Sequence, residues 1–309
     1  MSNVMSRRKA AGDTPRRPSF QRTETRTAYM FLAPNIIGFL LFSLLPVGAT
    51  LVISLLNWDL IRDPEFVGFQ NYTTLLTKDP IFREVLFNTA YFVIGVVPAS
   101  IIISLLLALV MNNGLKGISL FRAIFFIPVI TSSVAVAMLW RWLYNTDYGL
   151  INVGLNALGL PYIPWLTSTN WAMPAVIIMA VWKSLGYNMV IYLAGLQGIS
   201  PTLYEAAALD GAGGWARFRD ITLPLLGPTT FFILVISVIN SFQVFDLTFI
   251  LTQGGPGIAT TTIVMYIYDQ GFRYFQMGYA AAIAWVLFII IFLITLVQMQ
   301  YQKRWVHYD

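Results

Sequence analysis

The sequence predicts an all-α integral membrane protein with six transmembrane helices and cytoplasmic termini. Of its 309 residues, 57% are hydrophobic and 11% are charged, whereas soluble domains carry about 25% charged residues. The mean hydropathy is +0.69, and uncharged runs of more than 20 residues recur, which is the length that a helix needs to cross the hydrocarbon core. These runs lack the alternation of barrel strands. Backbone groups find no partners in lipid, so we expect helices.

The six predicted helices lie within one membrane domain, residues 27–302. No polar stretch between them is long enough to bury a core of its own, so we expect no separate soluble domain. The predicted spans are residues 28–57, 85–113, 119–144, 171–197, 227–251 and 274–302.

The N-terminal segment, residues 1–26, holds seven of the 19 basic residues together with prolines, serines and threonines. This composition is typical of a disordered basic cytoplasmic tail beside a membrane, and we expect no nucleic-acid partner. The apolar stretch that follows is about twice the length of a signal-peptide core and lacks a small-residue cleavage site. We therefore expect it to be retained as the first span.

Basic residues are concentrated on one side of the predicted membrane. With the N-terminus inside, thirteen lysines and arginines lie in the cytoplasm and five lie outside. The positive-inside rule therefore predicts cytoplasmic termini, with residues 303–309 as a cytoplasmic tail. The cytoplasmic basic residues beyond the N-terminal tail are Lys116, Arg122, Arg217, Arg219, Lys303 and Arg304.

Two predicted outside loops, residues 57–84 and 148–170, are rich in aromatic residues and proline. We expect both loops to be ordered. Their aromatic side chains either anchor helix ends at the lipid interface, which is the commoner role, or form a docking rim for an extracytoplasmic partner.

The predicted cytoplasmic loop between the fourth and fifth spans, residues 200–224, has the pattern of a helical hairpin. Ser200 suits the N-cap of a first helix, with Pro201 at the first helical position. Thr202 and Glu205 offer an alternative start, because they have capping-box spacing.

Three glycines end this first helix, and a second short helix is expected from Trp215 to Pro224. Gly211 permits the tight turn between the two. Trp215 and Phe218 would share a side of the second helix with Thr222. Such a hairpin presents apolar anchors that a cleft on another protein can hold.

The same segment resembles the EAA loop of binding-protein-dependent ABC transporter permeases. The family pattern is Glu-Ala-Ala, three residues, Gly, nine residues, Ile, one residue and Leu-Pro, and this chain fits it at every place. Similar blocks elsewhere, including residues 66–72, 121–128 and 252–256, narrow the resemblance to carbohydrate-type permeases like those for maltose and glycerol phosphate. The resemblance covers the chain from residue 28 onward. The matching loop residues are Glu205, Ala206, Ala207, Asp210, Gly211, Ile221, Leu223 and Pro224.

The resemblance implies a type I ABC importer permease of a bacterial or archaeal plasma (inner) membrane that translocates a sugar or related polar solute. The implied partners are ABC ATPase subunits, a second permease subunit in a heterodimer, and an extracytoplasmic solute-binding protein. Residues 200–224 would couple this chain to the ATPases. Closure of the ATPase subunits on ATP would then tilt the fourth and fifth spans as rigid bodies. We expect Glu205 to contact the ATPase, the alternative being a carboxylate that stabilises a helix N-terminus.

No motif in the chain supplies energy or catalysis. A P-loop needs a lysine directly after a glycine, and none of the five lysines follows one. The lone histidine, His307, lies close to the C-terminus, and there is no cysteine. We therefore predict a transport subunit that is not an enzyme, with no catalytic residue, no cofactor and no metal site.

Polar residues within the fourth and fifth spans are candidates for a solute path, because polar groups in lipid face a cavity or a partner. A lysine costs about 2.5–3.5 kcal/mol at mid-membrane, and Asp246 is a candidate partner for Lys183. The commoner role of such residues is to join helices or to contact a second permease. The path candidates are Lys183, Tyr187, Asn188, Asn240, Gln243 and Asp246.

The main alternative function is a stand-alone, ion-coupled secondary transporter. Such a protein would show inverted repeats, broken helices and carboxylates near the midplane, and the sequence shows no repeat and no central carboxylate. A membrane enzyme is a third reading, against which the missing catalytic clusters argue.

Overall fold

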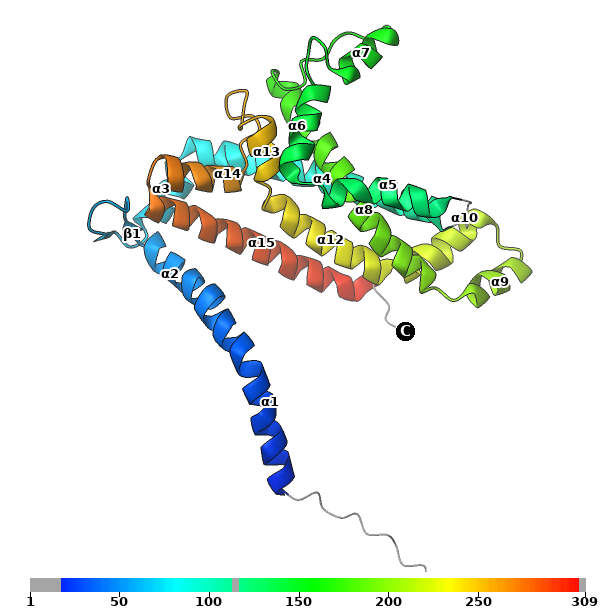
Figure 1. The fold of residues 1–309 in the computed structure, drawn as a ribbon, viewed down its shortest axis with the longest axis horizontal. Coiled ribbons are helices and arrows are strands. Elements are labelled where there is room, and N and C mark those ends of the chain that lie inside the picture. Colours follow the sequence, from blue (N-terminus) through cyan, green and yellow to red (C-terminus); the bar gives the residue numbers. More distant parts are fainter. Residues whose placement is uncertain (1–17, 113–116, 306–309) are drawn as a thin grey trace, which may run out of the picture. The chain divides into compact units, whose positions relative to one another are not determined.

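The computed structural model describes residues 18–112 and 117–305. Lys116, His307 and residues 1–17 of the predicted tail lie outside this part of the chain. The described residues are mostly helical (Figure 1). They belong to two compact units, one ending at Val52 and the other beginning at Ile53.

The first unit is one long apolar helical run. Its backbone is already helical at Pro18, within the predicted tail. The π-helical segment in its middle shifts the hydrogen-bond register, so that the Leu45 amide donates to the Leu40 carbonyl. From Thr25 onward the run is long and apolar enough to cross a membrane. Its elements are α1 (Pro18–Phe39), η1 (Leu40–Leu44) and α2 (Leu45–Ser54).

The second unit is built on four long helices. α4 packs along both α8 and α12, and α12 also contacts α15. The Asp79 carboxylate caps α4 by accepting a hydrogen bond from the Phe82 amide at 3.0 Å, and Pro80 occupies the first turn, where a missing N–H costs nothing. The long helices are α4 (Pro80–Met111), α8 (Thr169–Gln197), α12 (Gly227–Phe242) and α15 (Met277–Trp305).

The segment before α4 is ordered, as predicted for residues 57–84. Two short antiparallel strands pair Leu56 with Phe66. The Asn71 amide donates to the Leu56 carbonyl at 3.0 Å and so ties the first strand to the following helix. These elements are β1 (Leu56–Asn57), β2 (Glu65–Phe66) and α3 (Gln70–Thr77).

The predicted outside loop 148–170 is also ordered, and a buried asparagine holds it. The Asn152 amide nitrogen donates to the carbonyls of Thr146 and Ile163, while its oxygen accepts from the Trp165 indole at 3.1 Å. Asn152 is fully buried, so these bonds satisfy a group that would otherwise be costly to bury. It lies on α7 (Leu150–Ala157).

The third predicted span, residues 119–144, is not one helix, and this prediction was wrong. It is broken between α5 (Ile118–Ile130) and α6 (Ser133–Leu143), whose axes differ by 102°. Pro128 has no N–H to donate within the helix, and the last carbonyl before the break, that of Ile127, accepts from both the Thr131 amide at 3.1 Å and the Thr131 hydroxyl at 2.7 Å. Thr131 and Ser132 are extended, and Ser132 then occupies an N-cap position, which serine favours.

The fifth predicted span, residues 227–251, also ends earlier than expected. α12 stops at Phe242, and a separate helix, α13 (Asp246–Leu251), follows. The Val244 side chain between them is buried in the core. Its carbonyl accepts a hydrogen bond from the Thr262 hydroxyl at 2.9 Å. This hydrogen bond from Thr262 takes the place of a bond within a continuous helix. It joins residues far apart in the sequence, so no local pattern predicts it.

The other four predicted spans coincide with long helices to within five residues, except that the first helical run begins ten residues earlier, at Pro18. In the described residues, four helices are long and apolar enough to cross a membrane, or up to six if each of two bent helix pairs is one span. The remaining elements are α9 (Pro201–Leu209), α10 (Gly214–Arg217), η2 (Phe218–Thr222), α11 (Leu223–Leu225), α14 (Ile263–Tyr268) and η3 (Asp269–Arg273).

Candidate functional site

Residues 200–224 form the predicted hairpin, and its first limb is α9. Ser200 occupies the N-cap position and Pro201 the first turn, as predicted, although the Ser200 hydroxyl pairs with that of Thr202 at 2.8 Å and caps no backbone amide. The alternative capping-box start at Thr202 is therefore wrong. Glu205 lies mid-helix, outside the first turn, and is exposed.

Gly211 closes α9 with a left-handed turn. Its φ is 78°, and two hydrogen bonds close the turn in the Schellman pattern. The Gly211 amide donates to the Ala208 carbonyl at 3.1 Å, and the Ala212 amide donates to the Ala207 carbonyl at 2.8 Å. Left-handed backbone is accessible to glycine without a steric penalty, so the glycine at this position of the motif has a direct structural reason.

The second limb was predicted to stop at Pro224, but it continues beyond this residue. α10, η2 and α11 run on to Leu225, and the chain bends by 61° before Gly227. In η2 the Leu223 amide donates to the Phe218 carbonyl, five residues back. This π register lets the helical path pass a proline, whose missing N–H would break a regular α-helix.

Specific contacts fix the base of the hairpin. The Tyr204 and Thr222 hydroxyls are hydrogen-bonded at 2.9 Å and join the two limbs. Tyr204 and Ile221 pack against a buried cluster to which α4, α8 and α12 all contribute. The base of the hairpin is therefore packed against three long helices. The cluster includes Met111, Met189, Tyr192, Leu196, Leu226 and Ile233.

The tip of the hairpin exposes large apolar side chains. Leu209 is 90% exposed and Trp215 is 72% exposed. The Trp215 ring packs on that of Phe218 at 5.5 Å, as their spacing predicts, but Thr222 is buried and does not share this exposed side. Of the other motif residues, those exposed are Ala206, Asp210, Leu223 and Pro224, whereas Ala207 is half-buried.

Lys183 and Asp246 do not form the ion pair considered from the sequence. Lys183 instead donates to the Ser133 hydroxyl, at the start of α6. Asp246 is exposed, and its carboxylate accepts from the Leu247 amide at 3.0 Å. The break between α5 and α6 brings Ser133 next to Lys183. The sequence did not predict this contact, because residues 119–144 have the pattern of a single helix.

The other path candidates divide into a buried and an exposed group. Asn188 is only 4% exposed, and its amide nitrogen has no hydrogen-bond partner. Tyr187 and Asn240 are exposed. Gln243 is exposed and lines an otherwise mostly apolar cavity of about 340 Å³ between α12 and α15. Asn240 lies on α12, Gln243 directly follows it and Asp246 begins α13, and all three are exposed.

An aromatic cluster begins two residues after Gln243, and the sequence patterns did not predict it. The rings of Phe245 and Phe249 stack at 5.0 Å, and Tyr268 lies 5.2 Å from Phe245. The Arg273 guanidinium lies 5.7 Å from the Phe249 ring centre, within cation–π range. The sequence feature that could have indicated the cluster is two pairs of aromatic residues with a spacing of four, 245/249 and 268/272.

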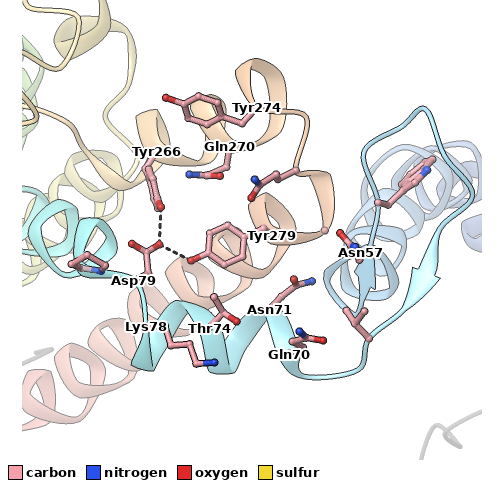
Figure 2. Close-up of a pocket in the computed structure, with 15 residues that line it drawn as sticks. Asn57, Gln70, Asn71, Thr74, Lys78, Asp79, Tyr266, Gln270, Tyr274 and Tyr279 are labelled. Atoms are coloured by element: carbon pink, nitrogen blue, oxygen red, sulfur yellow. Dashed lines mark hydrogen bonds between the residues drawn. The ribbon is translucent and has the colours of Figure 1, made fainter.

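A network of tyrosines around Asp79 connects α4, α14 and α15. Tyr266 and Tyr279 donate to one Asp79 oxygen at 2.6 and 2.5 Å, as Figure 2 shows. Burial alone would raise the pKa of Asp79, but these two bonds and that from the Phe82 amide outweigh it and hold the pKa below its usual value. The carboxylate is therefore charged at neutral pH.

No group of three or more histidine, aspartate or glutamate side chains is placed to hold a metal ion in the part of the chain that the structure describes.

The long apolar helices and the rooted hairpin define a membrane permease subunit of an ABC importer. The chain belongs to the family described as "Binding-protein-dependent transport system inner membrane component", which matches residues 77–307. Members of this family are transport subunits, not enzymes, as predicted. This membership decides in favour of the importer over the ion-coupled alternative, even though the structure contains the broken helices that the alternative would show.

Relatives cover nearly the whole chain. The lactose transport system permease protein LacF of Rhizobium radiobacter is 36% identical over 92% of this chain and 97% of its own length. The trehalose/maltose transport system permease protein MalF of Thermococcus litoralis is 36% identical, with coverages of 90% and 94%. A chain of the crystal structure of a bacterial alginate ABC transporter superposes with a TM-score of 0.81 at 27% identity and covers 94% of this chain, with 98% of its own length aligned.

Proposed function

We propose that this chain forms one half of the solute path of an ABC importer, that a second permease subunit forms the other half, and that ATPase subunits drive both by holding residues 200–224. The observation that carries the proposal is the hairpin, which is firmly rooted at its base and apolar at its exposed tip. Leu209 and Trp215 are exposed on a segment predicted to face water. Large apolar side chains in such a place are typical anchors for the cleft of a partner protein.

The energy of ATP reaches the membrane helices through the base of the hairpin. Tyr204 and Ile221 pack into the cluster that joins α4, α8 and α12, and packed interfaces of this kind move as rigid bodies. Closure of the ATPases would therefore swing the hairpin and tilt these helices together. The side to which the path opens would change as a result.

The cargo we propose is a sugar or a related polyhydroxylated solute. The similar permeases bear names that specify lactose and trehalose or maltose, and a third, SmoG of Agrobacterium fabrum, is named for sulfoquinovosyl glycerol. In this chain Asn240 and Gln243 expose carboxamides, and the Phe245–Phe249 stack follows them directly in the sequence. Carboxamides both donate to and accept from hydroxyl groups, and aromatic faces cover the apolar side of a sugar ring.

Capture of the ATPase subunits by the tagged chain tests the coupling role. Glu205→Lys reverses an exposed charge at the centre of α9, and we expect it to reduce the amount of ATPase that copurifies. Glu65→Lys is the matched control, because Glu65 is also an exposed glutamate but lies on β2. Equal capture and equal solute-stimulated ATP hydrolysis in the two variants would falsify the proposed role of the hairpin.

Transport by the complete complex tests the path. Gln243→Leu should lower the rate of solute uptake at least several-fold while ATPase capture stays unchanged, because the change lies far in sequence from the hairpin and removes only hydrogen-bonding capacity. Asn156→Leu, an exposed amide on α7, controls for added surface hydrophobicity. Normal uptake by Gln243→Leu would remove this residue from the path.

A further inference from the structure

A polar cavity lies in the second unit, apart from the path candidates and the hairpin. Its volume is about 620 Å³, and neither residues 200–224 nor any of the six path candidates line it. α3, β1 and the segment from η3 to the start of α15 surround it (Figure 2). Its lining combines the predicted outside loop, residues 57–84, with the predicted outer end of the last span, residues 274–302. A volume of this size falls within the range of about 300–1,000 Å³ that ligand pockets occupy.

The walls of this cavity are held in place by close contacts. A Cβ atom on Gly278 would lie 1.8 Å from the Leu56 carbonyl oxygen, so only glycine allows α15 to approach β1 this closely. The Met277 amide donates to the Trp58 carbonyl at 3.0 Å. Together with the bond from Asn71 to Leu56, these contacts preform the cavity, so a ligand need not order it on binding.

The one carboxylate in the wall is already fully engaged. One Asp79 oxygen accepts from both tyrosine hydroxyls, and the other accepts from a backbone amide. Gln270, 8% exposed, also lines the cavity, and its carboxamide hydrogen-bonds to Tyr266. The cavity therefore offers phenol and amide groups in place of a free negative charge. This chemistry does not suit a cation.

Other lining groups have unused hydrogen-bonding capacity. In the described chain, no protein group hydrogen-bonds to the side-chain amides of Asn57, Gln70 and Gln276. Each amide both donates and accepts, as a hydroxyl group does. Trp58 and Tyr274 add aromatic faces to the same wall. Lys78, which is exposed, adds an ammonium group that can donate to hydroxyl oxygens. Several amides beside aromatic rings, with no unpaired carboxylate, form a lining that matches a polyhydroxylated ring.

We propose that this cavity is an accessory binding site for a polyhydroxylated solute of monosaccharide to disaccharide size, outside the membrane path. The site itself rests on the cavity and its lining. The choice of a saccharide as the first probe rests on the proposed function. The alternative occupant is a loop of the solute-binding protein, which the test below separates from a small solute.

The test uses the complete complex in nanodiscs, without solute-binding protein, and maltose as the probe. Saturation-transfer NMR at millimolar maltose measures binding to the wild type, to Tyr274→Ala and to Gln70→Ala. Tyr148→Ala is the matched control, because Tyr148 is 62% exposed and Tyr274 is 63% exposed, and Tyr148 lies outside this cavity. We expect each cavity variant to weaken binding by about three- to tenfold, the loss that one hydrogen bond or ring contact produces, and the control to bind normally.

Stimulation of ATP hydrolysis by loaded solute-binding protein, measured on the same nanodiscs, reports the importer function independently. No maltose signal from a complex that retains this stimulation would overturn the accessory site and leave the proposed function intact. Loss of the signal in Gln243→Leu but not in Tyr274→Ala would place the bound sugar in the path and also overturn it. If the cavity variants instead weaken capture of the solute-binding protein and bind maltose normally, the cavity is a protein-docking surface and the proposal is wrong.

Discussion

Replacing Gly211 with alanine isolates one physical property of the hairpin, its left-handed turn. The residue has a φ of 78°, and no atom lies within 4 Å of the position that a Cβ would take. A new methyl group therefore meets no neighbour. The whole penalty comes from the backbone conformation, because an L-residue in the left-handed region brings its own Cβ too close to the following carbonyl oxygen.

This penalty is about 1–2 kcal/mol for alanine, which corresponds to a factor of about 5–30 in an equilibrium constant. The hairpin tip is exposed and is held by two backbone hydrogen bonds, so little else offsets the cost. If ATPase binding needs the closed turn, its apparent Kd should rise by up to the same factor. Gly211→Asn should cost less, because asparagine enters the left-handed region more readily.

The assay is a titration of purified ATPase subunits against the nanodisc-reconstituted permease. Gly214→Ala is the matched control, because Gly214 lies three residues from Gly211 in the same hairpin, has no left-handed backbone and also has open space around its Cβ position. The expected order of affinity is wild type and Gly214→Ala, then Gly211→Asn, then Gly211→Ala. Indistinguishable Kd values for the two alanine variants would refute the reasoning.

Three further predictions concern contacts of Asp79, Gly278 and Asn152. Asp79→Asn should destabilise the protein by about 1–3 kcal/mol at neutral pH, because it weakens hydrogen bonds to a charged group. The folded pKa of Asp79 is lowered, so this stabilisation is complete above the ordinary pKa of about 3.9 and is lost as pH falls through the folded value. The melting temperatures of wild type and variant should therefore converge in acid, and a constant difference at all pH values would contradict this. Gly278→Ala should lower the melting temperature through the clash with the Leu56 carbonyl. Gly154→Ala, in open space on α7, is the control and should leave the melting temperature unchanged or raise it. Equal melting temperatures for the two variants would show that the close approach of α15 to β1 is not needed for stability. Asn152→Ala leaves the buried Trp165 indole and two half-buried carbonyls without their partner, so limited proteolysis should cut within residues 146–165 far faster than in wild type. An unchanged cleavage rate would show that other contacts hold the loop.

Features that depend on neighbouring residues could be read from the sequence alone. Long uncharged runs identified the helices, because lipid leaves a backbone no other way to satisfy its hydrogen bonds. The hairpin was predictable for a similar reason, since the proline at its start and Gly211 at its turn act within a few residues of their own positions. The motif from Glu205 to Pro224 also identified the family, which the comparison with known proteins confirmed.

Features that depend on contacts between distant segments appeared only in the tertiary structure. The break after α5 places Ser133 beside Lys183, fifty residues away in the chain, so a lysine expected to seek Asp246 finds a hydroxyl instead. Asp79 meets its two tyrosines across almost two hundred residues. Side chains so far apart in sequence come together only when helices pack, and no local propensity encodes which helices will be neighbours. The sequence therefore determined the helices and the hairpin, and packing decided where polar groups meet.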